Sequence, residues 1–116
     1  MAYGNTDTGK NNEVIDCQNR YGADSSGGAG LVLGTDSTEA NTSITNPVDT
    51  VHLGNIAPSA GIGEMNFKTA AVAAETTLQE VGFYSGGVLD KRYALDAPVT
   101  VPIGSVALVT ATITGS

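Results

Sequence analysis

The chain has 116 residues and a mass of 11.7 kDa, the size of one folding unit, which excludes a two-domain enzyme. Hydrophobic residues make up 41% and charged residues 15%, which is enough apolar material for a core and excludes a wholly disordered chain. The 12 acidic and 5 basic side chains give a net charge of -7. This charge repels the phosphates of nucleic acids and anionic lipids, so we expect no nucleic-acid partner.

The N-terminal residues have no apolar pattern. We expect residues 1–13 to form an extended arm that orders only against a neighbour, and residues 14–116 to form a single β domain. No stretch approaches the roughly 18 apolar residues of a membrane span, and no secretion signal is recognisable, so we predict a soluble protein with no membrane partner. The single cysteine, Cys17, excludes an internal disulfide, and its neighbours Val14 and Ile15 indicate a small buried side chain rather than a catalytic thiol.

Three short apolar runs in the first 60 residues are each the size of a strand and are bounded by turn-forming residues. They occupy residues 14–15, 31–33 and 51–53. The glycine-rich residues 26–30 lack the Gly-Lys-Ser/Thr ending of a phosphate-binding loop, so they predict a flexible turn. The third run contains His52, and a lone histidine in a strand-like run is typical of a hydrogen-bonded structural group.

From Met65 onward, β-branched and aromatic residues alternate and turn residues recur at regular intervals. Residues 76–84 and 88–95 flank a Gly pair, which predicts a hairpin because glycine readily adopts the positive φ angles of such a turn. Residues 99–101 and 106–113 flank a Pro-Ile-Gly-Ser segment and predict a second, C-terminal hairpin. Residues 67–75 are ambiguous between helix and strand, because four alanines favour a helix while neighbouring threonines favour a strand; the strand is the preferred interpretation.

These segments, about seven to nine in number, predict an all-β fold with no long helix. We expect an antiparallel β-sandwich, jelly-roll-like, with the extended N-terminal arm. With two Phe, four Tyr and no Trp, the core must be thin. A thin core and sheet edges with few charges indicate a subunit that pairs with copies of itself or docks on a larger surface.

No pattern in the sequence points to catalytic, cofactor-binding or metal-binding residues, and we expect a protein that is not an enzyme and needs no cofactor. His52 is the one histidine, and no serine lies in the Gly-x-Ser-x-Gly turn of a hydrolase. The segments after Asp24 and Asp36 lack the alternating oxygen ligands of a calcium loop. A paired-carboxylate site would have to come from scattered acids that are better explained as solvated surface charge: Glu64, Glu75, Glu80, Asp90 and Asp96.

The C-terminal third resembles a recurrent module of tailed-bacteriophage virion proteins. The matching parts are the Glu-Val-Gly-Phe strand at residues 80–83, the Gly turn, the strand with Arg92, the Pro-Val-Thr segment at 98–100 and the Thr-rich final strand. The resemblance implies a virion structural protein. Within this module, Gly82 predicts a close approach of another chain segment, and Glu80 and Arg92 predict an opposite-charge pair across the hairpin.

The function that follows is that of a capsid decoration (cement) protein located on the capsid exterior. We expect it to bind the major capsid protein of the assembled shell as a homotrimer and to stabilise the shell. The alternative is a tail-fibre or tail-tip module that recognises a host receptor. The acidic charge, and a sequence without heptads or a repetitive shaft, favour decoration. A small hydrolase or carbohydrate-binding domain is the least favoured alternative.

Overall fold

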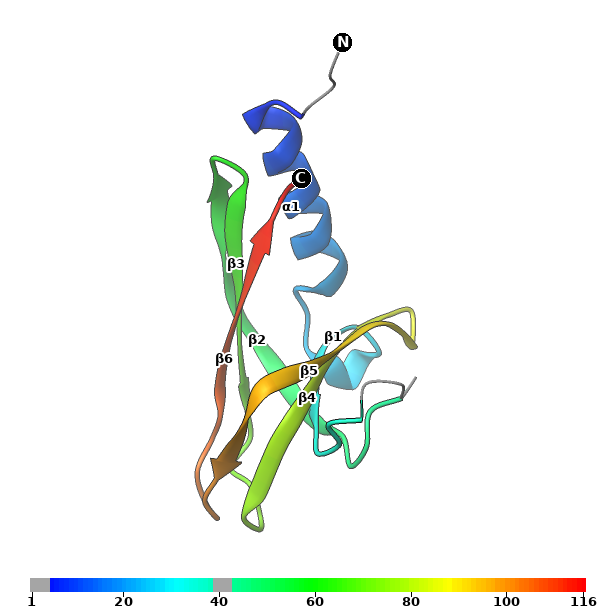
Figure 1. Ribbon diagram of the computed structural model, residues 1–116, viewed down its shortest axis with the longest axis vertical. Coiled ribbons are helices and arrows are strands. Elements are labelled where there is room, and N and C mark those ends of the chain that lie inside the picture. The colour runs from blue at the N-terminus through cyan, green and yellow to red at the C-terminus, as the bar shows by residue number, and fades with distance from the viewer. Residues whose placement is uncertain (1–4, 39–42) are drawn as a thin grey trace.

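The computed structural model describes residues 5–38 and 43–116, which form one curled antiparallel sheet and one helix (Figure 1). The elements are α1 (Asp7–Tyr21), the 3-10 turn η1 (Ser25–Gly27), β1 (Gly30–Gly34), β2 (Val48–Ser59), β3 (Ile62–Thr69), β4 (Thr76–Ser85), β5 (Val88–Val101) and β6 (Leu108–Thr114). The strands run in the order β5-β4-β1-β2-β3-β6. A predominantly β fold is therefore confirmed.

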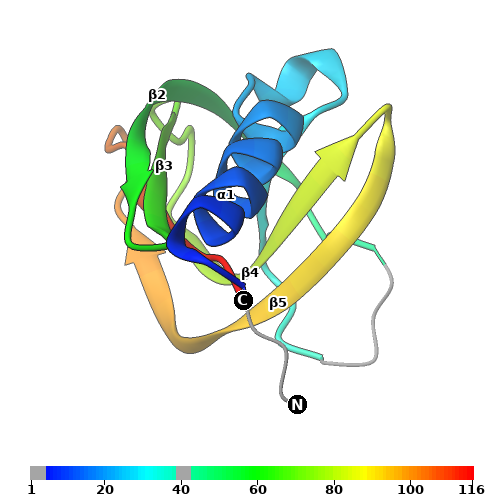
Figure 2. The same ribbon diagram turned by 90° about the horizontal axis from the view of Figure 1, so that it is seen from above.

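The sheet curls around the helix, as the view from above shows (Figure 2). Strands β5 and β6 are the two ends of the sheet, and each pairs on one side only within the described part of the chain. The described strands thus form one sheet, where a sandwich has two stacked sheets. The finer prediction of a jelly-roll-like sandwich is not confirmed.

Helix α1 occupies residues for which the sequence predicts an extended arm (7–13) and a strand-sized run (14–15). Both predictions are wrong for these residues, and residues 1–4 of the expected arm lie outside the described residues. The expected boundary between residues 13 and 14 falls inside the helix. The reason for the error is that the helix buries a narrow stripe, Val14, Gln18 and Tyr21, with polar residues on its other faces. So sparse a pattern lacks the broad apolar face of an ordinary surface helix.

Local hydrogen bonds define both ends of α1 and its position on the sheet. The Thr6 hydroxyl accepts from the Gly9 amide at 3.0 Å and caps the N-terminus. The Gly22 amide donates to the Gln18 carbonyl at 2.8 Å, and a Cβ at Gly22 would overlap that oxygen, so this end requires glycine. The Gln18 side-chain amide donates to the carbonyls of Ile56 (2.8 Å) and Glu64 (3.1 Å). These two bonds fix the helix to the concave face of β2 and β3.

Several of the predicted strands are present, whether their pairing is local or long-range. Residues 31–33 lie in β1 and residues 51–53 in β2. The predicted hairpin over 76–95 is confirmed as β4–β5, with φ angles of 59° at Gly86 and 77° at Gly87. In the ambiguous segment, residues 67–69 end β3 and residues 70–75 have no regular structure.

The predicted C-terminal hairpin is wrong. β5 pairs with β4 and β6 pairs with β3, so residues 102–107 connect the two ends of the sheet rather than two neighbouring strands. The segment after β3 holds this connection in place. The Val72 amide donates to the Ser105 carbonyl at 2.9 Å, and the Gly104 amide donates to the Val72 carbonyl at 2.8 Å. The turn itself is present, with the Ser105 amide donating to the Pro102 carbonyl at 3.1 Å, but it joins the two ends of the sheet and is bonded on its other side to Val72.

The core lies between α1 and the concave face of the sheet. It is small and mainly aliphatic, as the composition predicts. Its buried members are Tyr21, Leu31, Leu33, Met65, Phe67, Leu78 and Val101.

Candidate interaction site

A cleft of about 660 Å³ opens on the concave side of the sheet and extends along the β6 edge. Among the described residues that line it, Lys91 is the single charged one. The lining comes from α1, from the inner faces of β1, β3, β4 and β5, and from every residue of β6. The side chains of successive strand residues point to opposite faces of the sheet. Because every residue of β6 lines the cleft, the cleft includes the backbone edge of β6 as well as its inner face.

The backbone of β6 points alternately toward β3 and away from it. Odd positions face β3: the Ala107 carbonyl accepts from the Thr69 amide at 3.0 Å, and the Gly115 amide donates to the Gly61 carbonyl at 2.7 Å. The register between β3 and β6 is regular along the whole strand. The even positions therefore direct their N–H and C=O groups to the open side: Leu108, Thr110, Thr112 and Thr114.

Strand β6 lacks the charges, the proline and the register shifts that commonly prevent strand addition. Residues 97–116 contain no charged side chain, and β6 contains no proline. Apolar side chains near it are exposed, including Leu108 at 73% and Ile103 at 69% of their surface. A regular, uncharged edge strand of this kind is a template for another strand.

The β5 edge, at the other end of the sheet, has the opposite character. It carries Asp90, Lys91 and Asp96 besides the buried Arg92, and Pro98 has no backbone N–H to donate. Its pairing with β4 shifts register at two places. Charges, proline and bulges each discourage strand addition. Of the two ends of the sheet, β6 is the one open to a partner.

The predicted pair between Glu80 and Arg92 is confirmed and is buried. Arg92 Nε lies 2.7 Å from Glu80 Oε1, and the two side chains are 7% and 0% exposed. Glu80 Oε2 accepts from the amides of Asp36 (2.9 Å) and Thr45 (3.0 Å), while Arg92 Nη2 donates to the Asp36 carbonyl (2.9 Å). The pair thus ties the segments around Asp36 and Thr45 to the β4–β5 hairpin. Both carboxylate oxygens are occupied, so this acid has a structural role.

Two opposing effects act on the pKa of Glu80. Burial alone would raise it, but the amides of Asp36 and Thr45 and the charge and hydrogen bond of Arg92 together lower the pKa below its ordinary value. Glu80 is therefore ionised in the folded protein at neutral pH. Gly82, in the same strand, confirms the predicted close approach: a Cβ there would lie 2.7 Å from Leu89 Cδ1 and 2.8 Å from Ile44 Cδ1.

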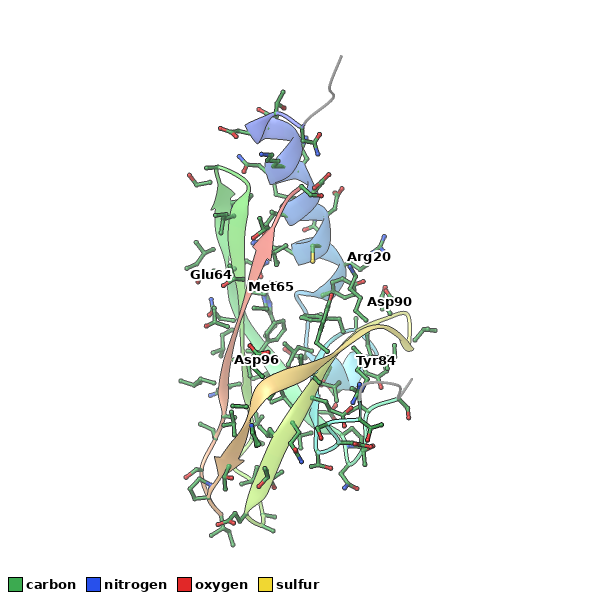
Figure 3. All side chains as sticks on the ribbon, in the orientation of Figure 1. Arg20, Glu64, Met65, Tyr84, Asp90 and Asp96 are labelled. Carbon is green, nitrogen blue, oxygen red and sulfur yellow. The ribbon has the colours of Figure 1, made fainter. Side chains whose placement is uncertain are left out.

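The other acids considered from the sequence are dispersed. Figure 3 shows Glu64, Asp90 and Asp96 on separate parts of the sheet. Asp90 accepts a hydrogen bond from the Tyr21 hydroxyl at 3.0 Å, and burial followed by this bond raises the pKa of Tyr21. Asp24 Oδ1 accepts from the His52 amide at 2.7 Å. Glu75 lies in the connection between β3 and β4. The structure brings these groups to structural hydrogen bonds or separate surfaces rather than to one centre.

The histidine and the cysteine also have structural surroundings. His52 Nε2 lies 2.8 Å from Asn55 Oδ1, and its ring packs 5.3 Å from that of Phe67. Cys17 is half-buried against the core and lines the cleft. Burial raises the pKa of the Cys17 thiol, although Lys91 and Arg20 act to lower it. The environment thus favours the neutral thiol over the nucleophilic thiolate.

Comparison with protein-family models, with curated proteins and with solved structures finds no match to this chain. Within residues 5–38 and 43–116, no three His, Cys, Asp or Glu residues are grouped so as to hold a metal ion. No helix in the same ranges has the length and apolar character needed to cross a membrane. The open β6 edge and the adjoining cleft are the features of the molecule best suited to binding. Sequence reasoning missed this site because it assigns the outer side of β6 to a hairpin partner.

Proposed function

We propose that this protein is a structural subunit of a tailed-bacteriophage particle, a capsid decoration protein that binds the outer surface of the assembled shell and stabilises it. The observation that carries the proposal is the open, uncharged edge of β6. An edge strand beside an apolar cleft suits a protein that acts through contacts with other polypeptides, whether copies of itself or proteins of the shell.

The sequence resemblance over residues 76–114 supports the virion as the setting. The β4–β5 hairpin of that module, its Gly82 contact and its Glu80–Arg92 pair are all present. The acidic charge of -7 supports a position outside the shell, because packaged DNA repels a chain of the same sign.

The stabilising mechanism follows from binding equilibria. A subunit that binds the assembled shell but not its free components stabilises the assembly by mass action. When each subunit joins neighbouring shell proteins, many weak contacts act together and dissociation of any one shell protein becomes rarer. Such a mechanism needs binding surfaces rather than a reactive centre.

Quantitative mass spectrometry of purified particles tests this function. We expect a copy number comparable with that of the major shell protein. Particles stripped of the subunit should lose their contents at a lower temperature, and adding the purified chain back should restore the higher one. A copy number of a few per particle would instead favour the tail-fibre or tail-tip alternative. Absence of the chain from particles would contradict both.

A further inference from the structure

We propose that the β6 edge binds the β6 edge of a second copy of this chain, forming a two-fold antiparallel pair centred on Ala111. This inference concerns the isolated chain and does not depend on the setting of a phage particle. It specifies a pair, in contrast to the trimer expected from the sequence.

The backbone groups needed for this pairing point the right way. The free N–H and C=O groups of β6 belong to the even positions, because the odd positions bond to β3 and its flanking residues. When two copies of β6 are placed antiparallel with Ala111 opposite Ala111, Leu108 faces the partner's Thr114 and Thr110 faces the partner's Thr112. These are all even positions, so each such pair exchanges two hydrogen bonds. Ala111 then forms a non-hydrogen-bonded pair on the symmetry axis.

This register also uses the whole strand. Ala111 is the midpoint of β6 (Leu108–Thr114), so every residue of the strand gains an opposite residue. On the outer face the pairs are Thr with Thr and Leu with Thr, and on the concave face they are Val109 with the partner's Ile113. Thr–Thr and β-branched pairs across antiparallel strands are favourable. A shift by two residues in either direction leaves strand ends unpaired.

The cleft explains what the second strand gains besides hydrogen bonds. Val109, Ala111 and Ile113 are half-buried and face the concave side, where they pack against the core. The same three residues of the partner lie one strand farther out in the pair. They extend the apolar inner surface of the sheet over the mouth of the cleft.

Helix α1 meets the chain just past the end of β6. It covers the inner face at Gly115, where a Cβ would overlap the Lys10 backbone. At Ser116 the amide donates to Glu13 Oε2 and the carbonyl accepts from Asn5 Nδ2, both at 2.7 Å. The even positions within β6, from Leu108 to Thr114, lie before this contact.

A second copy fits this site better than a small apolar ligand. A ligand without amides leaves the backbone N–H and C=O groups of Thr110 and Thr112 without hydrogen-bond partners in apolar surroundings. Burying unpaired polar groups costs free energy, and pairing with another strand avoids that cost. Charge favours the same choice. The chain repels its own copies through its net charge of -7, but residues 97–116 are uncharged and can meet their equivalents without that repulsion.

Disulfide cross-linking tests the pair and its register. In a Cys17→Ala background, Ala111→Cys places two thiols on the axis, where Cα atoms of a non-hydrogen-bonded pair are about 4.5 Å apart and within disulfide range. Mild oxidation should link most of the protein into dimers. Thr110→Cys is the matched control, because residue 110 faces residue 112 of the partner and not itself. No cross-linking at 111, or equal cross-linking at 110, would overturn the proposal.

Solution mass tests the role of the edge amides. Analytical ultracentrifugation should give twice the 11.7 kDa of one chain for the native protein at high concentration. Thr112→Pro removes an outward N–H without touching a bond to β3, so it should weaken association about tenfold or more, while Thr112→Val should not. A native monomer, a trimer, or a Thr112→Pro variant that associates normally would each contradict the proposal. Any of these results leaves the particle copy number as a separate test of the proposed function.

Discussion

The two ends of the sheet hold equivalent positions in the fold but differ in chemistry. β5 carries four charged residues and Pro98, and its pairing with β4 is irregular. β6 is regular, uncharged and rich in threonine and β-branched residues. Exposed edges generally invite strand addition, and natural proteins block those that must stay free. One blocked edge and one open edge in the same sheet indicate that addition is directed to β6.

The two ends also differ in how they are held together. At β5, the buried Glu80–Arg92 pair connects the hairpin to the segments around Asp36 and Thr45. At β6, the strand depends on its bonds to β3 and on packing of its inner face. We therefore expect substitutions near β5 to change the stability of the single chain and substitutions on the β6 edge to change its association.

The largest effect is expected from Glu80→Gln. Removing one charge leaves Arg92 buried without its counter-ion, and breaking a buried pair in this way typically costs about 3 kcal/mol or more. Urea denaturation should show this loss in the free energy of unfolding. Glu75→Gln, which changes an acid outside the regular elements, is the control and should change stability by less than about 0.5 kcal/mol. Equal effects of the two changes would contradict the structural role of Glu80.

A smaller loss is expected from Gly82→Ala. The added Cβ would crowd Leu89 and Ile44 on the outer side of β4, and overpacking of this kind costs about 1–3 kcal/mol. Thermal unfolding should report the decrease. Gly27→Ala is the control, because a Cβ at Gly27 meets no atom within 4 Å. A Gly82→Ala variant as stable as the native protein would show that this contact is loose.

Acid should destabilise the β5 end through Glu80. Because folding lowers the pKa of Glu80, its contribution is complete above the unfolded value of about 4.3 and is lost as pH falls through the lower folded value. Unfolding curves between pH 7 and pH 2 should show a decline that Glu80→Gln reduces. A variant with an unchanged acid profile would indicate that other carboxyls dominate.

The smallest effect on the stability of the single chain is expected from Thr110→Lys. Thr110 is exposed on the outer face of β6, so a surface substitution there should change the free energy of unfolding by less than about 0.5 kcal/mol. The added charge gives β6 a protection that β5 already has and should reduce self-association. Asp96→Thr removes an exposed charge from β5 outside the cleft and should leave association unchanged, because Pro98 and the irregular pairing with β4 still protect that edge. Light scattering at increasing concentration compares the two.

The sequence predicts what is local. The Gly turn between β4 and β5, the contact of Gly82 with Leu89 and the Glu80–Arg92 pair all lie within one hairpin. The contact of Gly82 with Ile44 comes from a distant segment, and the sequence gives no sign of that partner. Helix α1 escaped prediction because its buried stripe is narrow and includes a glutamine, Gln18, whose two bonds to strand carbonyls replace apolar contact.

The partner of β6 could not be predicted for a different reason. Residues 102–105 form a turn sequence that suits a hairpin, yet Val72 provides bonding partners from a segment about 30 positions earlier in the chain. Long-range pairing of this kind leaves no periodic signal in either strand. The open edge follows from that pairing, so it could not be recognised before the fold.

Amide hydrogen exchange, followed residue by residue along β6, tests the central claim most directly. At low concentration, the amides of Val109, Ala111 and Ile113 should be protected by β3, while those at the even positions exchange quickly. At high concentration we expect the even positions, Leu108, Thr110, Thr112 and Thr114, to become protected as well. Even-position amides that exchange quickly at every concentration would contradict the account.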